Sequence, residues 1–368
     1  MKIKAAVTRS ANAPFVIEEV DLAEPKAGEV LVRVVASGIC HTDEVAQTQQ
    51  IPVPLPAVLG HEGCGIVERV GEGVTEFAPG DRVGFSYAFC GHCESCIQGM
   101  PYACENLNAI NFGGVMPDMT TRLSQNGQPI STFFGQSSFA EYAVVHSDNV
   151  VKVPYDDIDL ALVGPLGCGV QTGAGTVLNY LKPKFGSSIV VFGCGTVGMS
   201  AIMAARLAGC RQIIAVGGNP KSLALALEIG ATQTINRKEC SDLVAEIKRI
   251  SDGGVNYAVE TSGAETFILA GLRSLRFKGV EAIVGLSGEI KLHLHFDLMA
   301  EAKTLSGVIE GDAVSKIFIP QLIDYYHQGR FPFDKLVKFY PFEQINQALE
   351  DSHAGKCIKA VVRMDGKA

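Results

Sequence analysis

The sequence predicts an α/β protein in which a β-rich domain is combined with a doubly wound parallel sheet. The chain has 368 residues, 47% of them hydrophobic, and this length suffices for about two domains, each with its own core. Short apolar runs separated by Gly and Pro occupy residues 1–169. From 170 to 310, strand-length apolar runs alternate with helix-length amphipathic segments, a pattern typical of parallel strands joined by helices.

The expected elements follow in a simple order. In the first stretch, EVLVRVVASG and GCGIVERVG have the composition of strands. In the second, the strands SIVVFG and CRQIIAVGG alternate with the helices TVGMSAIMAARLAG and PKSLALALEIGA. The last stretch, 311–368, contains the expected helices FIPQLIDYYHQG and FEQINQALEDSHAG and ends in the strand CIKAVVRM. We expect this stretch to return to the first domain and complete it.

A dense group of cysteines interrupts the β-rich domain at residues 88–106. Cys90, Cys93, Cys96 and Cys104 form the pattern C-x2-C-x2-C-x7-C. Four thiolates close the tetrahedral shell of a zinc ion and leave no open position, so the site is structural. Two disulfides are the alternative, but they belong to small secreted domains.

Composition limits the environment and the partners. The N-terminus has no apolar stretch like that of a signal peptide, and no window approaches the roughly 20 apolar residues of a membrane span. A soluble, cytoplasmic protein is expected. The net charge is −8 without a basic stripe, which argues against a nucleic-acid partner.

A glycine-rich turn marks the expected nucleotide site. The strand SIVVF runs into Gly193, Cys194, Gly195, Thr196, Val197 and Gly198, which match G-x-G-x-x-G, and a helix follows. In this context the glycines allow a tight turn and close approach of a pyrophosphate to the backbone and the helix N-terminus. A dinucleotide is the predicted ligand, and a merely glycine-rich turn is the alternative.

The end of the second strand bears on which dinucleotide binds. An acidic residue there accepts a hydrogen bond from the ribose 2′-hydroxyl of NAD. This chain has Gly217 at that point, followed by Gly218, Asn219, Pro220 and Lys221. Without a carboxylate and with a cation nearby, NADP is the preferred cofactor. NAD held through its other contacts remains the alternative.

A second set of metal-ligand residues is dispersed along the chain. Cys40 stands in SGICHTDE, His61 and Glu62 stand in LGHEGCG, and Cys168 stands in GPLGCGVQTG. Two sulfurs, one nitrogen and an open fourth position are what a catalytic zinc ion needs to act as a Lewis acid on an alcohol or carbonyl oxygen. Each residue alone is more often part of a core or a surface.

These motifs together resemble the zinc-dependent medium-chain alcohol dehydrogenases. The GHE motif, the GICHTD segment, the four-cysteine lobe and the later G-x-G-x-x-G occur in that family's order, and the resemblance covers essentially the whole chain. Pro54-Leu55-Pro56, GQSSFAEY and GPLGCGVQTGAG are similar to the branch of aryl-, benzyl- and allylic-alcohol dehydrogenases. The resemblance implies a GroES-like catalytic domain (1–169), a Rossmann cofactor domain (170–310) and a C-terminal return (311–368).

The resemblance also implies roles for individual residues. Cys40, His61 and Cys168 match the ligands of the catalytic zinc, and Glu62 matches a carboxylate close to it. Asp43 matches the partner of the ligand histidine, and Thr42 the hydroxyl that receives the substrate proton. The family's relay histidine is replaced by Val45. The proton route therefore stays open between the cofactor ribose with water and His41, which the family places beside the pyrophosphate.

Further cofactor and substrate residues follow from the same resemblance. Thr172 is expected by the nicotinamide, Val284 to Leu286 by the carboxamide, and Lys359 at the pyrophosphate, with a solvated surface lysine as the alternative. The expected reaction is hydride transfer between NADP(H) and a hydrophobic alcohol or aldehyde of benzyl, cinnamyl or terpenoid type, with aldehyde reduction favoured in cells. Aromatic residues expected to line the substrate channel are Tyr87, Phe112, Phe133 and Phe134.

Other classes remain open. A zinc-free quinone reductase would share the fold but lack the cysteine lobe, and a structural homologue would bind the cofactor without turnover. Formaldehyde chemistry on a glutathione adduct has no dedicated basic pocket to support it. Relatives pair their cofactor domains edge to edge, so a homodimer or homotetramer is expected near EAIVGL and KTLSGVIEG.

Overall fold

The computed structural model describes residues 1–366 and divides the chain into two compact units. The first unit contains Met1–Cys168, Val314–Gln321 and the stretch from Val337 onward. The second unit contains Gly169–Ala313 and Leu322–Leu336. The predicted fold class is confirmed: the first unit is built on mainly antiparallel sheets, and the second on a parallel sheet with helices.

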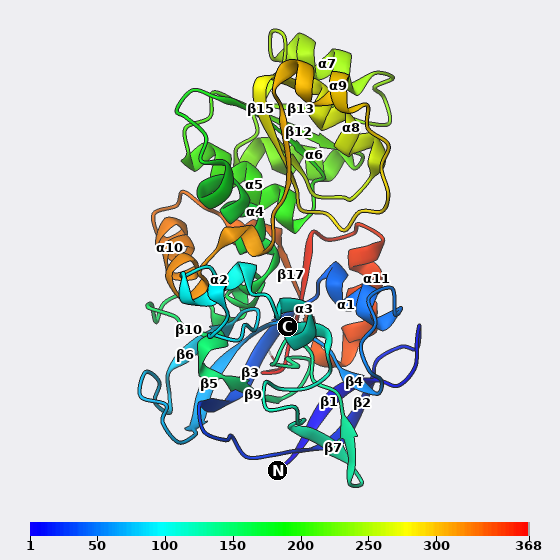
Figure 1. Ribbon diagram of the computed structural model, residues 1–368. Coiled ribbons are helices and arrows are strands. Elements are labelled where there is room, and N and C mark those ends of the chain that lie inside the picture. The colour runs from blue at the N-terminus through cyan, green and yellow to red at the C-terminus, as the bar shows by residue number, and fades with distance from the viewer. Residues whose placement is uncertain (367–368) are drawn as a thin grey trace. The chain divides into compact units, whose positions relative to one another are not determined.

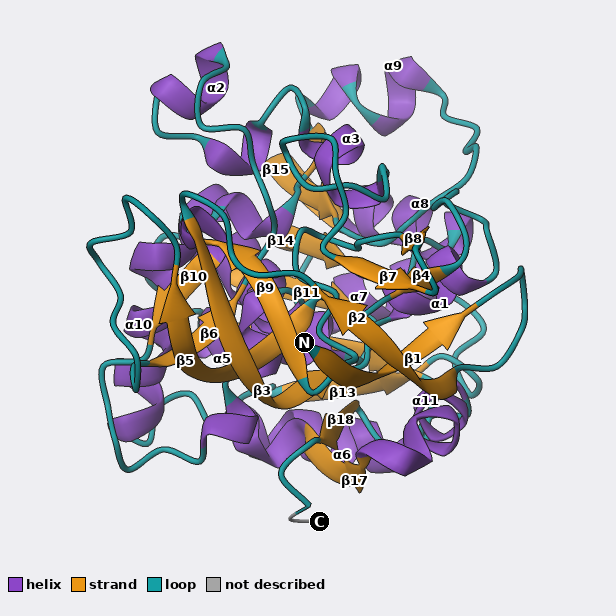
Figure 2. Ribbon diagram, turned by 90° about the horizontal axis from the view of Figure 1, so that it is seen from below, coloured by secondary structure: helices purple, strands orange, loops and turns teal. Residues whose placement is uncertain are grey.

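Short strands arranged in two sheets build the first unit. These strands are β1 (Lys2–Thr8), β2 (Val16–Leu22), β3 (Glu29–Gly38), β4 (Ala57–Val58), β5 (Glu62–Val70), β6 (Arg82–Phe85), β7 (Leu123–Gln125), β8 (Gln128–Ile130), β9 (Tyr142–His146), β10 (Val150–Lys152), β17 (Val337–Pro341) and β18 (Lys359–Arg363). One sheet has the order β4-β1-β2-β7-β8. The other has the order β10-β6-β5-β3-β18-β17, with β9 also paired to β3 (Figure 2).

Strand β3 shows why the sequence folds this way. Successive side chains of a strand point to opposite faces, and β3 is apolar on both. Val30, Val32 and Val34 enter one core together with Phe85. Leu31 enters the other core. Burial on both faces explains why this run reads as continuously hydrophobic.

Helices of the first unit are short. They are α1 (His41–Gln47), α2 (Glu94–Ile97), α3 (Leu107–Phe112) and α11 (Ile345–His353). Helix α10 (Ser315–His327) is shared, because its residues up to Gln321 belong to the first unit and the rest to the second.

The second unit contains one parallel sheet of six strands in the order β13-β12-β11-β14-β15-β16. Its strands are β11 (Ser188–Phe192), β12 (Gln212–Gly217), β13 (Gln233–Asn236), β14 (Val255–Glu260), β15 (Leu275–Ile283) and β16 (Thr304–Gly307). Its helices, several of them labelled in Figure 1, are α4 (Gly169–Gly175), α5 (Thr196–Leu207), α6 (Pro220–Ile229), α7 (Leu243–Ile250), α8 (Glu265–Ser274) and α9 (Leu294–Asp297).

This strand order creates a place for a ligand. The chain runs outward from β11 through β12 to β13, and then returns to add β14 on the other side of β11. Ligands of such sheets bind at the carboxyl ends of the strands, at the point where the order reverses. The turn after β11 lies at that point.

No single helix within residues 1–366 has both the length and the apolar composition needed to cross a membrane. Only a bent pair, Leu160–Gly167 with Gly169–Leu181, meets the two criteria when taken together.

Candidate active site

Four dispersed residues form one cluster in the first unit. One ligand atom from each of Cys40, His61, Glu62 and Cys168 lies within 4.8 Å of the others. All four belong to the first unit. The cluster joins residues that are up to 128 positions apart in the chain, from Cys40 to Cys168.

Strand pairing and close backbone packing assemble this cluster. In the β3–β5 ladder, Gly38 lies opposite Glu62, so Cys40 and His61 flank the ends of paired strands. A Cβ on Gly38 would lie 2.0 Å from Oε2 of Glu62, which means that only glycine leaves room for that carboxylate. A Cβ on Gly164 would lie 2.3 Å from the Glu62 carbonyl oxygen, so the segment leading to Cys168 packs directly on β5.

His61 is oriented for metal binding by Asp43. The Nδ1 atom of His61 donates to Oδ1 of Asp43 at 3.0 Å, and both side chains are fully buried. Asp43 also accepts from the backbone N–H groups of Cys40 at 2.9 Å and Gly60 at 3.1 Å. These bonds hold the carboxylate in place, and the carboxylate in turn directs the imidazole Nε2 atom toward the thiols.

The residues of the cluster fit a zinc ion. Nε2 of His61 is buried and has no hydrogen-bond partner among residues 1–366, and such an atom is costly to bury unless something binds it. Two thiols and one imidazole are the donor set of a catalytic zinc site. The hydrogen bond from Cys168 is the main influence that holds the pKa of Cys40 well below its usual value, which favours the thiolate that zinc binds.

One member of the cluster, Glu62, forms a buried ion pair with Lys359. Nζ of Lys359 donates to the two carboxylate oxygens of Glu62 at 2.8 and 2.7 Å and to the carbonyl oxygen of Ile39 at 2.9 Å. Burial opposes the ammonium charge, but the Glu62 carboxylate outweighs it and raises the pKa of Lys359. The surface-lysine alternative is wrong, because Lys359 is 2% exposed. All three N–H donors are used, so the expected pyrophosphate contact of Lys359 finds no support here.

The four-cysteine lobe forms a second cluster. The sulfur atoms of Cys90 and Cys96 are 4.0 Å apart, as are those of Cys93 and Cys104. Zinc–sulfur bonds of about 2.3 Å in a tetrahedron place sulfurs about 3.8 Å apart, so the cluster fits zinc. All cysteines are free thiols, which rules out the disulfide alternative.

Aromatic side chains surround the histidine of the dispersed cluster. The ring centroids of Phe133 and Phe134 lie 5.5 and 4.6 Å from that of His61. Phe112 contacts both phenylalanines, at 5.8 and 5.2 Å. Tyr87 is buried and contacts Phe89 at 6.2 Å. Phe133 and Phe134 thus lie beside His61, and Phe112 lies against both of them. All four predicted channel residues are part of the core of the first unit or pack against it, and Phe133 is fully buried.

Thr42 and His41 follow Cys40 on α1. The Thr42 hydroxyl lies 3.7 Å from the Cys40 sulfur. His41 is exposed, and its Nδ1 lies 3.1 Å from Glu44. Val45, which stands where relatives have a relay histidine, is buried at 1% exposure and carries no proton-transferring group.

The glycine-rich turn of the second unit has the shape that a pyrophosphate requires. Gly193 has a φ of +98°, which disfavours other residues. A Cβ on Gly195 would have no atom within 4 Å, so this side of the turn is open. A Cβ on Gly198 would lie 1.9 Å from the carbonyl oxygen of Gly193, so the helix packs closely on the turn. The N-cap residue of α5 is Gly195, which has no side chain of its own to cap the helix. The turn therefore fits a phosphate.

The remaining predicted cofactor residues lie in the second unit. Gly217 ends β12, and Asn219 caps α6 by accepting from the N–H of Lys221 at 3.0 Å. Val284 follows β15 and donates its N–H to the carbonyl oxygen of Glu260 at 2.8 Å. The Thr172 hydroxyl donates to Glu310 at 3.3 Å. Leu286 is 58% exposed.

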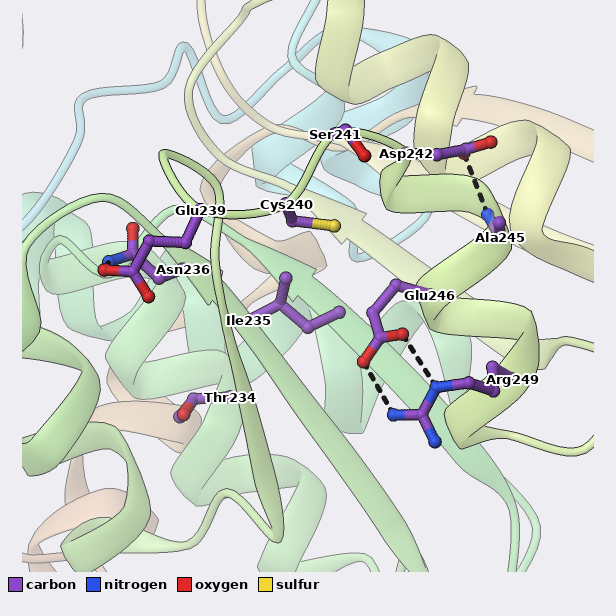
Figure 3. Close-up of a pocket in the computed structure, with 10 residues that line it drawn as sticks. All are labelled: Thr234, Ile235, Asn236, Glu239, Cys240, Ser241, Asp242, Ala245, Glu246 and Arg249. Carbon is purple, nitrogen blue, oxygen red and sulfur yellow. Dashed lines mark hydrogen bonds and ion pairs between the residues drawn. The ribbon is translucent and has the colours of Figure 1, made fainter.

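A separate pocket of about 500 Å³ opens beside β13 and α7 (Figure 3). No predicted site residue lines it. Glu246 in its wall pairs with Arg249 at 2.7 and 2.8 Å, and Asp242 caps α7 by accepting from the N–H of Ala245 at 3.0 Å. Its lining residues are Thr234, Ile235, Asn236, Glu239, Cys240, Ser241, Asp242, Ala245, Glu246 and Arg249.

Sequence reasoning missed the role of Lys359 in the dispersed cluster. One signal could have found it: CIKAVVRM places a lysine inside an otherwise apolar strand, where a cation needs a buried partner. The identity of that partner, Glu62, depends on the pairing of β18 and β5 with β3.

Fold and clusters together define a zinc-binding, dinucleotide-dependent dehydrogenase. Residues 26–155 match the family model "Alcohol dehydrogenase GroES-like domain", and residues 196–325 match "Zinc-binding dehydrogenase".

Full-length relatives agree with this class. The chain is 43% identical over 364 residues to geraniol dehydrogenase of Castellaniella defragrans, covering 98% of this chain and 97% of that protein. The crystal structure of an alcohol dehydrogenase zinc-binding domain protein from Burkholderia ambifaria matches with a TM-score of 0.96 and 49% identity, covering 99% of both chains. Benzyl alcohol dehydrogenase of Acinetobacter calcoaceticus matches with a TM-score of 0.95 and 45% identity, also over 99% of both chains. The chain therefore belongs to the zinc-dependent alcohol dehydrogenase family, and the predicted resemblance is confirmed.

Proposed function

We propose that this chain is an alcohol dehydrogenase and aldehyde reductase that transfers hydride between NADP(H) and a primary allylic or aromatic alcohol. The observation that carries the proposal is the buried Nε2 atom of His61, which has no hydrogen-bond partner among the described residues and is grouped with Cys40 and Cys168. Two relatives are named for an allylic and an aromatic alcohol, geraniol and benzyl alcohol.

The residues in and beside the dispersed cluster divide the tasks of the proposed reaction. Cys40, His61 and Cys168 would hold the zinc ion, and Asp43 keeps the imidazole in the tautomer that binds metal. When bound, a zinc ion would supply Lewis acidity toward the substrate oxygen, and a nicotinamide cofactor would supply the hydride chemistry. The Thr42 hydroxyl receives the proton of the alcohol.

Val45 cannot take part in the next steps of the proton route, because it has no group that transfers a proton. His41 and the cofactor ribose with water are the two remaining exits, and His41 has the exposure that an exit to solvent needs. Glu62 stays bonded to Lys359, so its negative charge lies beside the metal site together with a compensating positive charge.

The second unit supports a preference for NADP. Gly217 offers no carboxylate to the ribose 2′ position. A Cβ on Gly217 would lie 2.9 Å from the sulfur of Cys194, so an acidic residue would fit there only if that thiol moved. Reduction of the aldehyde is the proposed cellular direction, and an NAD-dependent aryl-alcohol dehydrogenase is the alternative.

The phenylalanines beside His61 support a flat, apolar substrate. The rings of Phe112 and Phe134, rather than polar groups, lie near the metal ligands, and the fully buried Phe133 packs against both. An aromatic or allylic carbon skeleton packs well against such faces.

We also propose that the protein is a homodimer or homotetramer. Strand β16 is an edge of the parallel sheet, and Leu294, Phe296 and Met299 nearby in the chain are each at least 64% exposed. Unpaired edges and exposed apolar side chains favour association. A monomer in sedimentation velocity would contradict this.

Initial rates test the reaction and the cofactor together. We would measure the rate of cinnamaldehyde reduction with NADPH or NADH at equal concentrations. The rates of geraniol and benzyl alcohol oxidation would be measured with NADP+ or NAD+ in the same way. A strong NADP(H) preference supports the proposal. Equal rates, or a preference for NAD(H), support the NAD-dependent alternative. No turnover with any substrate would remove the proposed substrate class.

A further inference from the structure

Two cationic side chains lie over the glycine that follows β12. Strands β12 and β13 are parallel neighbours, with Gly217 opposite Asn236, so the residues after both strands share one edge of the sheet. The N–H of Arg237 donates to the carbonyl oxygen of Gly217 at 2.9 Å. A Cβ on Gly218 would lie 2.9 Å from Nε of Arg237 and 3.4 Å from Cε of Lys238.

Gly218 therefore leaves space for the guanidinium. Its φ lies outside the left-handed region, so the backbone there does not demand glycine. What a side chain at Gly218 would meet is the Arg237 side chain itself.

The two cations carry uncompensated charge. Both side chains are exposed, and neither forms an ion pair or a side-chain hydrogen bond within the described part of the chain. The guanidinium carbon of Arg237 lies 5.8 Å from the centre of the Phe267 ring, which keeps the group beside the sheet edge. The nearby Glu239 carboxylate accepts instead from Asn236 at 2.6 Å.

We propose that Arg237 and Lys238, together with Lys221, bind the 2′-phosphate of the cofactor's adenosine ribose. This inference rests on the proposed NADP dependence and names the residues that determine it. Guanidinium groups bind phosphate oxygens through paired hydrogen bonds, and lysines add point charge. The site lies where a carboxylate would otherwise accept from the 2′-hydroxyl.

The pocket of Figure 3 does not compete for this phosphate. It contains the neighbouring residues Asn236 and Glu239 but neither Arg237 nor Lys238. Glu239, Asp242 and Glu246 bring carboxylates to that pocket, which repel a phosphate.

Cofactor fragments provide a test that does not depend on turnover. Binding of 2′,5′-ADP and of 5′-AMP would be measured by calorimetry for the zinc-loaded protein and for Arg237→Ala, Arg237→Lys, Lys238→Ala and Lys221→Ala. Arg211→Ala is the matched control, because Arg211 is exposed and precedes the opposite, amino end of β12. Thermal unfolding of each variant reports whether it folds.

Wild type should bind 2′,5′-ADP more tightly than 5′-AMP. Arg237→Ala should weaken 2′,5′-ADP binding by about 10- to 100-fold, as expected for lost hydrogen bonds to a charged group, and should hardly change 5′-AMP binding. Arg237→Lys should recover part of this loss, Lys238→Ala and Lys221→Ala should lose less, and Arg211→Ala should match wild type.

Two results would overturn the inference, and they differ in whether the proposed NADP dependence also fails. If wild type discriminates between the fragments and Arg237→Ala discriminates equally well, NADP dependence stands and these residues do not explain it. If wild type binds both fragments equally and prefers NADH in turnover, the NADP proposal and this site both fail.

Discussion

The two cysteine-rich clusters differ in how the chain builds them. Cys90, Cys93, Cys96 and Cys104 come from one segment of 15 residues, and local turns alone bring them together. Cys40, His61 and Cys168 come from three segments, and the strand pairing of Gly38 with Glu62 is needed to assemble them. A local cluster stabilises its own lobe, whereas a dispersed one depends on the whole unit and can place reactive groups in a buried site.

The largest predicted effect is the loss of enzyme activity when a ligand of the dispersed cluster is removed. Cys168→Ser removes one ligand of the dispersed site, so zinc content should fall from two ions to one per chain. Lewis acidity at the substrate oxygen accounts for several kcal/mol, so kcat/KM should fall at least about 1000-fold. Metal analysis and steady-state kinetics check this. A variant that keeps two zinc ions, or most of its activity, would contradict the ligand assignment.

The second prediction concerns the ion pair that Glu62 of the dispersed cluster forms with Lys359. Lys359→Met leaves the buried Glu62 carboxylate without its cation. Removing one partner of a buried pair destabilises a protein by about 3–5 kcal/mol. Chemical unfolding measures the change.

A double variant is the control for this prediction. Glu62→Gln combined with Lys359→Met removes both charges and should recover part of the lost stability. Single and double variants of equal stability would show that the pair contributes little.

The third prediction contrasts Glu62 with a buried carboxyl that has no bonded partner. Both oxygens of Glu281 lack hydrogen-bond partners within residues 1–366. Burial, assisted by the charge of Glu260, raises the pKa of Glu281 from 4.5 to about 9. The folded state thus holds a proton that the unfolded state has released, and stability should fall as the pH rises between these two values.

Glu281→Gln should remove this dependence. At pH 7 the stability loss from the shift is about 3 kcal/mol, so the variant should gain up to that amount and show a flatter pH profile. Unfolding from pH 5 to 9 measures it, with the exposed Glu289→Gln as control. An unchanged slope in Glu281→Gln would show that another group is responsible.

The smallest effect on activity is expected in the local cluster. Cys96→Ser should release its zinc ion and expose residues 88–106 to protease. Because these cysteines carry out no chemistry, kcat/KM per folded molecule should change about threefold or less, equivalent to about 0.7 kcal/mol. A loss as large as that of Cys168→Ser would erase the distinction between the clusters.

Several features were predictable because their signals are local. The four cysteines lie within one segment of 15 residues, and the glycines after SIVVF lie within a segment of six. The alternation of strands and helices indicated the parallel sheet. Lys359 was harder, since its own segment shows a misplaced cation but not Glu62, which is 297 residues away in the chain.

The sequence by itself determined the fold class, the four-cysteine lobe and the dinucleotide turn, because periodicity and short spacings can be recognised without knowledge of the fold. Only the tertiary structure decided that Lys359 neutralises Glu62, that Glu281 is buried without a hydrogen-bond partner in the described part of the chain, and that Arg237 lies over Gly218. The physical reason is that strand pairing sets these contacts. Burial in the sheets then decides which charges are compensated and which remain available to a ligand.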